Sequence, residues 1–362
     1  MIDTKKFTNK IKKYSNFFVG VPDSVLKNFT NNLGKKRKSH IISTNEGSAI
    51  GTACGYNLAT KKIACVYMQN SGLGNAINPL ISIAHKKVYS IPMVLIIGWR
   101  GSPGTDDEPQ HKLKGNITTD LLKLLNIKYY VINSDKDFGK VDKIFKSVKK
   151  NNQAGALLIK NGVLKKIGKK NKILRSGLEK EYFFLKLLKV LKKSDRIISS
   201  TGYTSREIYQ TRVNHNIING KDFYLVGGMG HTLSTALGYL NNKNKRIVCI
   251  DGDGSLLMHL GSMHLVNVMN SKKLKHIILN NNSHESVGGQ TTQADLINFK
   301  LLSKSLGYKN YLKIDNKNNL TNKLNIFLKK KGPSFLEVVC KNSTLKNLTR
   351  PKNLEKIKKK FL

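Results

Sequence analysis

Two turns rich in oxygen ligands follow two hydrophobic strands in the second half of the chain. Asp253 lies in a Gly-Asp-Gly turn after the apolar run Ile247–Ile250, and Asn281 follows the apolar run His276–Leu279. The carboxyl ends of parallel strands meet at the edge of a sheet where ligands bind, so we expect these side chains to lie close together. Carboxylate and amide oxygens suit Mg²⁺, which in proteins usually shares phosphate ligands. The spacing therefore predicts a site for Mg²⁺ and a diphosphate.

Glycines on both sides of Asp253 leave room for such a ligand. Gly252 and Gly254 carry no side chain, so the backbone of this turn can approach a diphosphate closely. A single Gly-Asp-Gly turn is common by chance. Its combination with an Asn-Asn turn after the next strand is specific.

These turns require parallel strands that lie side by side, and the hydrophobic pattern supplies them. Strand-length apolar runs alternate with helical stretches along the whole chain, including a helix expected at Leu256–Met269 between the two turns. This alternation predicts an α/β fold with two doubly wound parallel sheets. The expected strands are Phe17–Val19, Ile63–Met68, Met93–Ile97, Tyr129–Ile132, Ala156–Ile159, Ile197–Ser199, Ile247–Ile250, Ile277–Leu279 and Phe335–Val339.

The two halves of the chain resemble each other. The segments Gly47–Tyr56 and Gly230–Tyr239 both carry small residues at every fourth position, and each precedes a buried strand and a glycine-rich turn. With 362 residues the chain can form two cores, so we expect two related domains, 1–165 and 186–362, joined by a linker at 166–185. Only the second copy carries the acidic turn, so we expect the diphosphate chemistry there.

The formal net charge of +42 allows two interpretations. A basic surface is typical of proteins that bind nucleic acid or membrane surfaces. However, the excess is nearly all Lys spread over many segments, without a zinc finger, an RNP-type motif or a basic zipper. This pattern favours a general drift in composition, and we expect neither a nucleic-acid partner nor a membrane partner.

The cysteines and the hydrophobic segments indicate where the protein resides. Four scattered cysteines show no metal-ligand spacing and are expected to be buried thiols in a reducing compartment. No apolar run reaches the length needed to span a bilayer, and residues 1–13 lack an apolar signal core. We therefore expect a cytoplasmic protein.

The paired turns resemble the thiamine diphosphate signature of a superfamily of decarboxylases. The resemblance implies that Asp253 and Asn281 bind Mg²⁺ through their side chains and Ser283 through its carbonyl. Asn282 stands where the family usually has Gly, and Asn tolerates left-handed dihedral angles. Residues 1–165 would then bind the pyrimidine of the cofactor and 186–362 its diphosphate. The cofactor-binding residues implied are Gly228, Met229, Gly252, Asp253, Gly254, Ser255, Asn281 and Ser283.

The first half carries a second motif of the same superfamily. Glu46, in Asn-Glu-Gly ahead of the small-residue helix, resembles the catalytic glutamate of the pyrimidine-binding domain. A buried carboxylic acid can protonate the aminopyrimidine, whose imino form then deprotonates the thiazolium. Without the metal motif, Glu46 would simply be an acid favoured by a helix N-terminus. Met229 stands where the family places an apolar side chain that bends the cofactor.

The compact layout resembles the phosphonopyruvate and sulfopyruvate decarboxylases, because only the linker separates the two domains. Four further stretches resemble the former: residues 20–24, 98–111, 201–207 and 284–290, with Glu285 where Asp is expected. The resemblance implies a carboxy-lyase that converts 3-phosphonopyruvate to phosphonoacetaldehyde and CO₂ in phosphonate biosynthesis.

Side chains in these stretches provide candidates for substrate binding and proton transfer. A phosphonate dianion needs cations and hydrogen-bond donors, for which we select Arg100, Arg206 and Ser24. One proton must be delivered after CO₂ leaves, and His111 and His284 are the candidate donors because imidazole titrates near neutral pH.

The resemblance also implies a homodimer or a higher homo-oligomer, in which domains of two subunits complete each active site. Sulfopyruvate decarboxylase is the nearest alternative, and a carboligase of the acetolactate synthase type is more distant. A basic nucleic-acid-binding protein on a vestigial cofactor fold is the alternative from another class. It is disfavoured because Glu46, Asp253 and Asn281 are all present.

Overall fold

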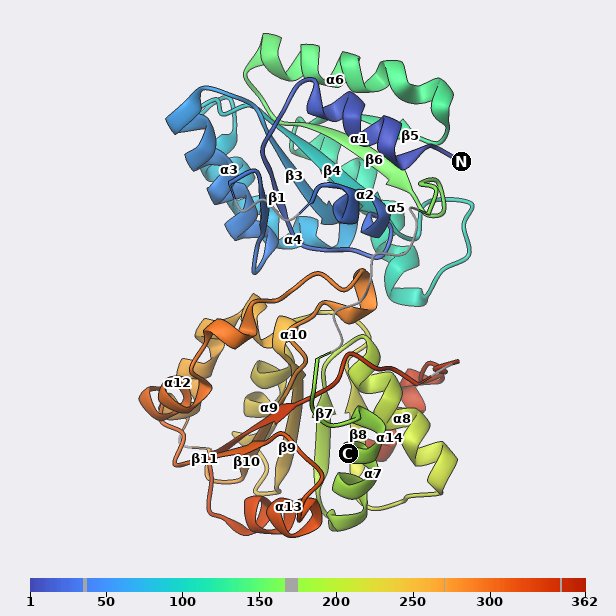
Figure 1. Cartoon of the computed structure of the whole chain (residues 1–362). Helices are drawn as coiled ribbons and strands as arrows, with labels where there is room; N and C mark the ends of the chain where they lie inside the picture. The colour runs from blue at the N-terminus through green and yellow to red at the C-terminus, as the bar shows by residue number, and fades with distance from the viewer. Residues whose placement is uncertain (35–37, 167–174, 270, 346) are drawn as a thin grey trace. The chain divides into compact units, whose positions relative to one another are not determined.

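A computed structural model describes the chain except for residues 35–37, 167–174, 270 and 346. The chain divides into two compact units, each built on its own sheet (Figure 1). Unit 1 comprises Met1–Asn171 together with His284–Gln290, and unit 2 comprises Lys172–Ser283 together with Thr291–Leu362.

Unit 1 is a parallel six-stranded sheet flanked by helices. The strand order is β2-β1-β3-β4-β6-β5. The strands are β1 (Phe18–Gly20), β2 (His40–Ile42), β3 (Ala64–Gln69), β4 (Met93–Trp99), β5 (Lys128–Ile132) and β6 (Gly155–Lys160). The α-helices are α1 (Thr4–Lys12), α2 (Lys27–Asn32), α3 (Glu46–Thr60), α4 (Leu73–Pro79), α5 (Pro109–Leu124) and α6 (Phe138–Asn151).

Unit 2 has the same architecture. Its parallel sheet has the order β11-β12-β10-β9-β7-β8. The strands are β7 (Arg196–Ser199), β8 (Lys221–Tyr224), β9 (Ile247–Gly252), β10 (Leu274–Asn280), β11 (Asn310–Ile314) and β12 (Ser334–Val339). The α-helices are α7 (Lys180–Val190), α8 (Tyr203–His215), α9 (Thr232–Leu240), α10 (Asp253–Met258), α11 (Leu265–Val268), α12 (Phe299–Ser305), α13 (Leu320–Lys329) and α14 (Leu354–Phe361).

The two sheets share one topology. When the strands of each unit are counted from its first strand, both orders read 2-1-3-4-6-5, since the second sheet read backwards is β8-β7-β9-β10-β12-β11. The repeated small-residue segments fall on equivalent helices, α3 after the second strand of unit 1 and α9 after the second strand of unit 2. The structure therefore confirms the α/β fold with two doubly wound parallel sheets, and it gives the internal repeat a structural basis.

Both sheets are buried on both faces, as parallel sheets with helices on each side must be. In β9, Val248 and Ile250 pack into one core of unit 2, whereas Ile247 and Cys249 pack into the core on the opposite face. All four cysteines are buried free thiols, as expected.

The hydrophobic pattern of the sequence did not predict three of the strands. These are β2, β8 and β11, which lie at edges of the sheets and carry partly exposed residues. An edge strand has one neighbour and needs no continuous apolar run, so its hydrophobic signal is weak.

One expected helix was wrong. The expected helix Leu256–Met269 is interrupted, because α10 ends at Met258 and a 3₁₀ turn, Leu260–His264, precedes α11. The break lies at His259, whose φ of −135° and ψ of 51° are not helical.

The linker expected at 166–185 falls partly on residues 167–174, which lie outside the described residues. At its other end, helix α7 already begins at Lys180. Phe183 and Phe184 are fully buried in the core of unit 2, so packing extends the second unit into the range expected for the linker.

Among the described residues, no helix combines the length and the apolar character needed to cross a bilayer.

Candidate functional site

The acidic turn of unit 2 holds a carboxylate whose ionised form is disfavoured by burial. Strand β9 ends at Gly252, and Asp253 begins α10 with only 3% of its surface exposed. Burial raises the pKa of Asp253 to about 6, although the hydroxyl of Thr292 and the N–H groups of Gly254 and Asn282 favour its ionised form. The Thr292 hydroxyl donates to Oδ2 at 2.6 Å. The turn thus presents a buried acid at the carboxyl edge of the sheet.

The amide turn follows the neighbouring strand. β9 and β10 pair in parallel, with Leu279 opposite Gly252, so Asn281 leaves β10 beside the acidic turn. Its Oδ1 accepts the backbone N–H of Ser283 at 3.1 Å. Asn282 has a φ of 52°, the left-handed conformation for which Asn is suited. This agrees with the expectation that Asn can replace Gly at this position.

One threonine connects the two turns. Thr292 Oγ1 lies 2.6 Å from Oδ2 of Asp253 and 3.3 Å from Oδ1 of Asn282. The hydrophobic pattern did not indicate this residue, because it lies beyond both strand ends in a segment without such a pattern. Its hydroxyl joins the turn of Asp253 to the turn of Asn281, and these two residues are 28 positions apart in the sequence.

The donor set fits a hard divalent cation. Asp253 offers a buried carboxylate, Asn281 an amide oxygen and Ser283 a backbone carbonyl, all of them oxygen ligands of the kind that Mg²⁺ prefers. A bound cation would stabilise the ionised form of Asp253, which burial now opposes. Arg175 adds positive potential, since its charge also lowers the pKa of Asp253.

A glycine loop lies directly against the acidic turn. Gly228 and Gly230 have φ values of 60° and 91°, which residues with side chains rarely adopt. A β-carbon on Gly230 would lie 2.5 Å from Cδ2 of His259, so the loop can approach the end of α10 only with Gly here. Met229 lies half-buried between these glycines. The two residues Gly228 and Met229, selected from the sequence, are therefore held in a constrained loop.

Unit 1 carries Glu46 in a fitted cradle. Asn45 caps α3 by accepting the N–H of Ser48 at 2.8 Å, which places Glu46 in the first turn with 5% of its surface exposed. Asn75 donates to Oε2 at 2.8 Å. A β-carbon on Gly72 would lie 2.3 Å from Oε1, so Gly72 makes room for the carboxylate. The sequence did not indicate Asn75 or Gly72 as partners of this acid.

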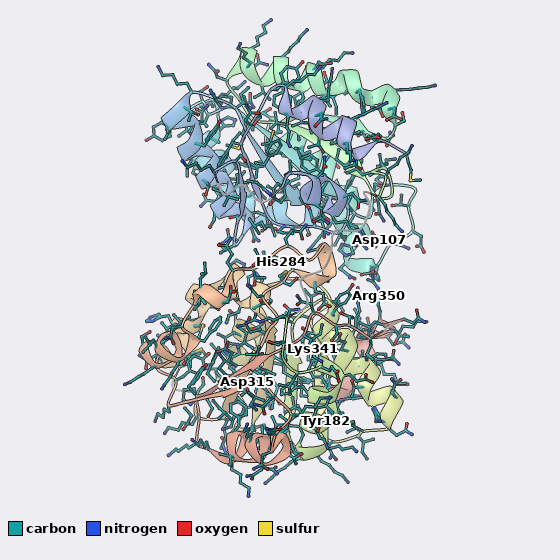
Figure 2. The ribbon with its side chains drawn as sticks, viewed as in Figure 1. Asp107, Tyr182, His284, Asp315, Lys341 and Arg350 are labelled. Carbon is teal, nitrogen blue, oxygen red and sulfur yellow. The ribbon has the colours of Figure 1, made fainter. Side chains whose placement is uncertain are left out.

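The candidate cation of unit 1 already has an acidic partner. Arg100 donates through Nε to Oδ2 of Asp107 at 2.7 Å and through Nη2 to Oδ1, and its Nη1 lies 3.2 Å from the hydroxyl of Ser24. Asp107 is labelled in Figure 2. Although burial opposes its ionisation, hydrogen bonds from Arg100 and the charge of Arg100 lower the pKa of this carboxyl. Arg100 and Ser24, both selected from the sequence, are brought together. Asp107 as their partner was missed.

His111 belongs to the same cluster. Its Nε2 lies 3.7 Å from Oε2 of Glu108, and Glu108 is also 3.6 Å from Nη2 of Arg100. The candidate proton donor His111 and the candidate anion-binding residues Arg100 and Ser24 thus share one region of unit 1.

The remaining candidates lie elsewhere. Arg206 is a half-buried residue of α8 in unit 2. His284, labelled in Figure 2, opens the segment His284–Gln290, which groups with unit 1. Its backbone N–H donates to the carbonyl of Gln290 at 2.7 Å.

Two protein families match the two halves of the chain. Residues 12–124 match "Thiamine pyrophosphate enzyme, N-terminal TPP binding domain" and residues 199–338 match "Thiamine pyrophosphate enzyme, C-terminal TPP binding domain". The first range contains Glu46, and the second contains both Asp253 and Asn281.

Curated relatives match nearly the whole chain. Phosphonopyruvate decarboxylase from Streptomyces hygroscopicus is 32% identical over 354 residues, which cover 92% of this chain and 86% of the relative. Its counterpart from Streptomyces viridochromogenes is 31% identical, covering 92% and 87%. A sulfopyruvate decarboxylase from Methanosarcina acetivorans is 24% identical, covering 88% and 86%.

Substitution of Asp253 tests the metal site directly. We expect Asp253→Asn to weaken binding of Mg²⁺ and thiamine diphosphate by roughly 100-fold, because the ion loses its charged ligand. Isothermal titration calorimetry measures this without any turnover. Asp315→Asn is the control, since Asp315 is an exposed carboxylate of the same unit (Figure 2) and should bind like the wild type. Equal affinities of Asp253→Asn and the wild type would contradict the assignment.

Proposed function

This chain belongs to the thiamine pyrophosphate enzymes, in the family of the phosphonopyruvate decarboxylases, and we propose that it decarboxylates 3-phosphonopyruvate to phosphonoacetaldehyde and CO₂. It is a carboxy-lyase with thiamine diphosphate as cofactor. One observation carries the proposal: identity of 32% to a phosphonopyruvate decarboxylase extends over 92% of the chain.

The cofactor would give each of the two buried acids, Asp253 and Glu46, a role. When bound, thiamine diphosphate supplies an electron sink for the electron pair released as CO₂ leaves. We propose that Asp253, Asn281 and Ser283 hold Mg²⁺ for its diphosphate. Glu46, fixed by Asn75 and by the space at Gly72, would exchange a proton with the aminopyrimidine.

The substrate choice rests on the relatives and on the anion-binding side chains. The phosphonopyruvate decarboxylases match at 32% and 31% identity, against 24% for the sulfopyruvate decarboxylase. Arg100 and Ser24 offer a guanidinium and a hydroxyl 3.2 Å apart, which together suit a phosphonate or a sulfonate. A sulfonate substrate is therefore the second candidate. Since 3-phosphonopyruvate is the first candidate, we propose that the reaction belongs to phosphonate biosynthesis.

A panel of 2-oxo acids tests the proposed function. With Mg²⁺ and thiamine diphosphate present, we expect CO₂ release to be fastest with 3-phosphonopyruvate, slower with sulfopyruvate and marginal with pyruvate. Omission of the cofactor is the control and should abolish release. A higher kcat/KM for sulfopyruvate would reassign the substrate, and release of acetolactate from pyruvate would indicate a carboligase.

The role of Arg100 can be separated from its contribution to stability. We expect Arg100→Ala to raise the KM for 3-phosphonopyruvate by about 10- to 100-fold, because a hydrogen bond between charged groups is lost. Arg212→Ala is the matched control: Arg212 also binds a buried carboxylate, that of Asp222, and its side chain is 12% exposed against 15% for Arg100. The control should lower thermal stability and leave KM unchanged. An unchanged KM in Arg100→Ala would remove this residue from substrate binding.

We also propose that α3 provides a surface for a second copy of the chain. Among the described residues, a β-carbon on Gly51 or Gly55 would meet no atom within 4 Å, and Leu58 on the same helix is 71% exposed. A helix with an uncovered small-residue face can pack closely against the same helix of another subunit.

Sedimentation velocity tests this surface. We expect the wild type to sediment as a dimer or larger, and Gly55→Arg to shift toward the monomer because the guanidinium prevents close helix packing. Gly139→Arg is the control, since Gly139 of α6 also has no atom within 4 Å of its β-carbon position. A Gly55→Arg protein that sediments like the wild type would exclude α3 as the interface.

A further inference from the structure

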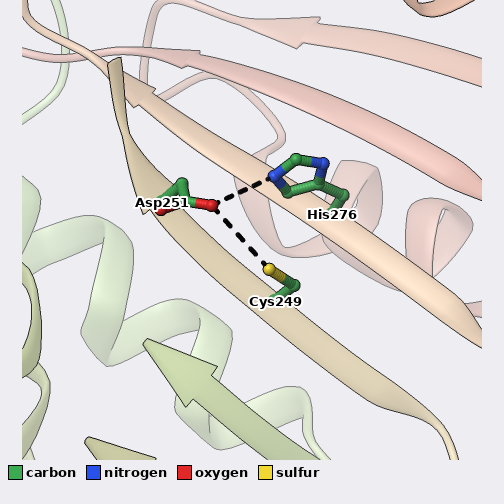
Figure 3. Close-up of side chains that lie close together, drawn as sticks. All are labelled: Cys249, Asp251 and His276. Carbon is green, nitrogen blue, oxygen red and sulfur yellow. Dashed lines mark hydrogen bonds and ion pairs between the residues drawn. The ribbon is translucent and has the colours of Figure 1, made fainter. Parts of the chain in front are cut away.

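A second carboxylate lies beneath the metal-binding turn and points into the core. Asp251 is two residues before Asp253, but it is part of β9 and shares the face of that strand with Cys249 (Figure 3). Asp251 is 2% exposed, Cys249 is 0% exposed and the neighbouring His276 of β10 is 0% exposed. Burial of three polar side chains in a hydrophobic core is costly unless they are paired, so their partners matter.

One oxygen of the Asp251 carboxylate accepts a hydrogen bond, and the other lies near two buried side chains. Oδ1 accepts the hydroxyl of Ser255 at 2.9 Å. Oδ2 lies 3.5 Å from Nε2 of His276 and 4.0 Å from the Cys249 thiol (Figure 3). The other imidazole nitrogen, Nδ1, is 2.6 Å from the hydroxyl of Tyr308. Nε2 faces a carboxylate, so we assign its hydrogen there, and the Tyr308 hydroxyl then donates to Nδ1.

Ser255 extends this network to the cofactor loop. Its hydroxyl group donates to Oδ1 of Asp251, and its oxygen accepts the backbone N–H of Gly230 at 3.1 Å. Gly230 closes the glycine loop that carries Met229, whereas Ser255 and Asp253 belong to the same short helix. The loop and the metal-binding turn are therefore joined through one buried hydroxyl, and the orientation of that hydroxyl depends on Asp251.

We propose that Asp251 and His276 are positioning residues for the cofactor site. This proposal rests on the proposed function. Asp251 and His276 would hold Ser255 in place, and Ser255 would keep the spacing between the Met229 loop and the Asp253 turn fixed. Their contacts are to Ser255, Cys249, Tyr308 and each other, so we assign them no contact with substrate. The network is thus the outer shell of the metal site, and disruption of such a shell typically weakens metal binding by about 10- to 100-fold.

The test compares affinity with stability. In the wild type, calorimetric titration with Mg²⁺ and thiamine diphosphate sets the reference, and thermal unfolding without ligands is measured in parallel. We expect Asp251→Asn to bind the cofactor about 10- to 100-fold more weakly while remaining folded. Asp195→Asn is the matched control, because Asp195 is also 2% exposed and paired, to Arg246 and the N–H of Lys192, but lies before β7. It should lose stability and bind the cofactor like the wild type.

Ser255→Ala keeps the proposal testable even if Asp251→Asn does not fold. This substitution removes only the shared hydroxyl and should weaken cofactor binding to a similar extent. In the double variant Asp251→Asn/Ser255→Ala, the two losses of affinity should not add, because both substitutions break the same network. Wild-type affinity in a folded Asp251→Asn or Ser255→Ala protein would overturn the proposal. So would a tightly bound transition metal in the purified wild type that Cys249→Ala releases, since Asp251 would then be a metal ligand.

Failure of this proposal is distinguishable from failure of the proposed function. The titrations record binding and need no turnover. A wild type that binds thiamine diphosphate but releases no CO₂ from 3-phosphonopyruvate would refute the substrate and leave the positioning network untouched.

Discussion

A buried carboxylate at the end of a central strand is the constraint around which unit 2 is organised. Asp253 has 3% of its surface exposed, and burial raises its pKa to about 6, so the fold keeps an acid where water cannot solvate its charge. Such a residue is stable as an ion only if other groups supply compensation. The hydroxyl of Thr292, two backbone N–H groups and the distant charge of Arg175 supply part of it. A divalent cation would supply the rest, which supports the proposal that this turn binds Mg²⁺.

The repeated topology shows how one fold serves two tasks. Both sheets have the same strand order, and both place a small-residue helix after the second strand. The turn after the third strand differs: in unit 2 it carries Asp253, and in unit 1 it leads through Asn70–Gly72 toward the cradle of Glu46. A duplicated framework thus offers a ligand for a cation in one copy and a hydrogen-bonding acid in the other.

Much of this was predictable from the sequence, because buried parallel strands are continuous apolar runs and the chemistry follows them directly. The central strands, both small-residue helices and the turns that carry Asp253 and Asn281 were found in this way. The edge strand β2 was missed because its three residues lack a continuous apolar pattern. Partners such as Thr292, Asn75 and Asp107 were missed for a different reason. Each joins its site from a separate loop or helix, and only the folded chain sets the distance between their atoms.

The position of Gly72 requires a residue without a side chain, although this residue takes no part in the reaction. The space a β-carbon would need there is filled by the carboxylate of Glu46, 2.3 Å from Oε1. A related protein could therefore retain the glutamate in its sequence and still be unable to place it. When uncharacterised genomes are searched for functional members of this family, positions 46 and 72 form one diagnostic pair. We expect the glutamate carboxylate to take the position seen here only where glycine accompanies it.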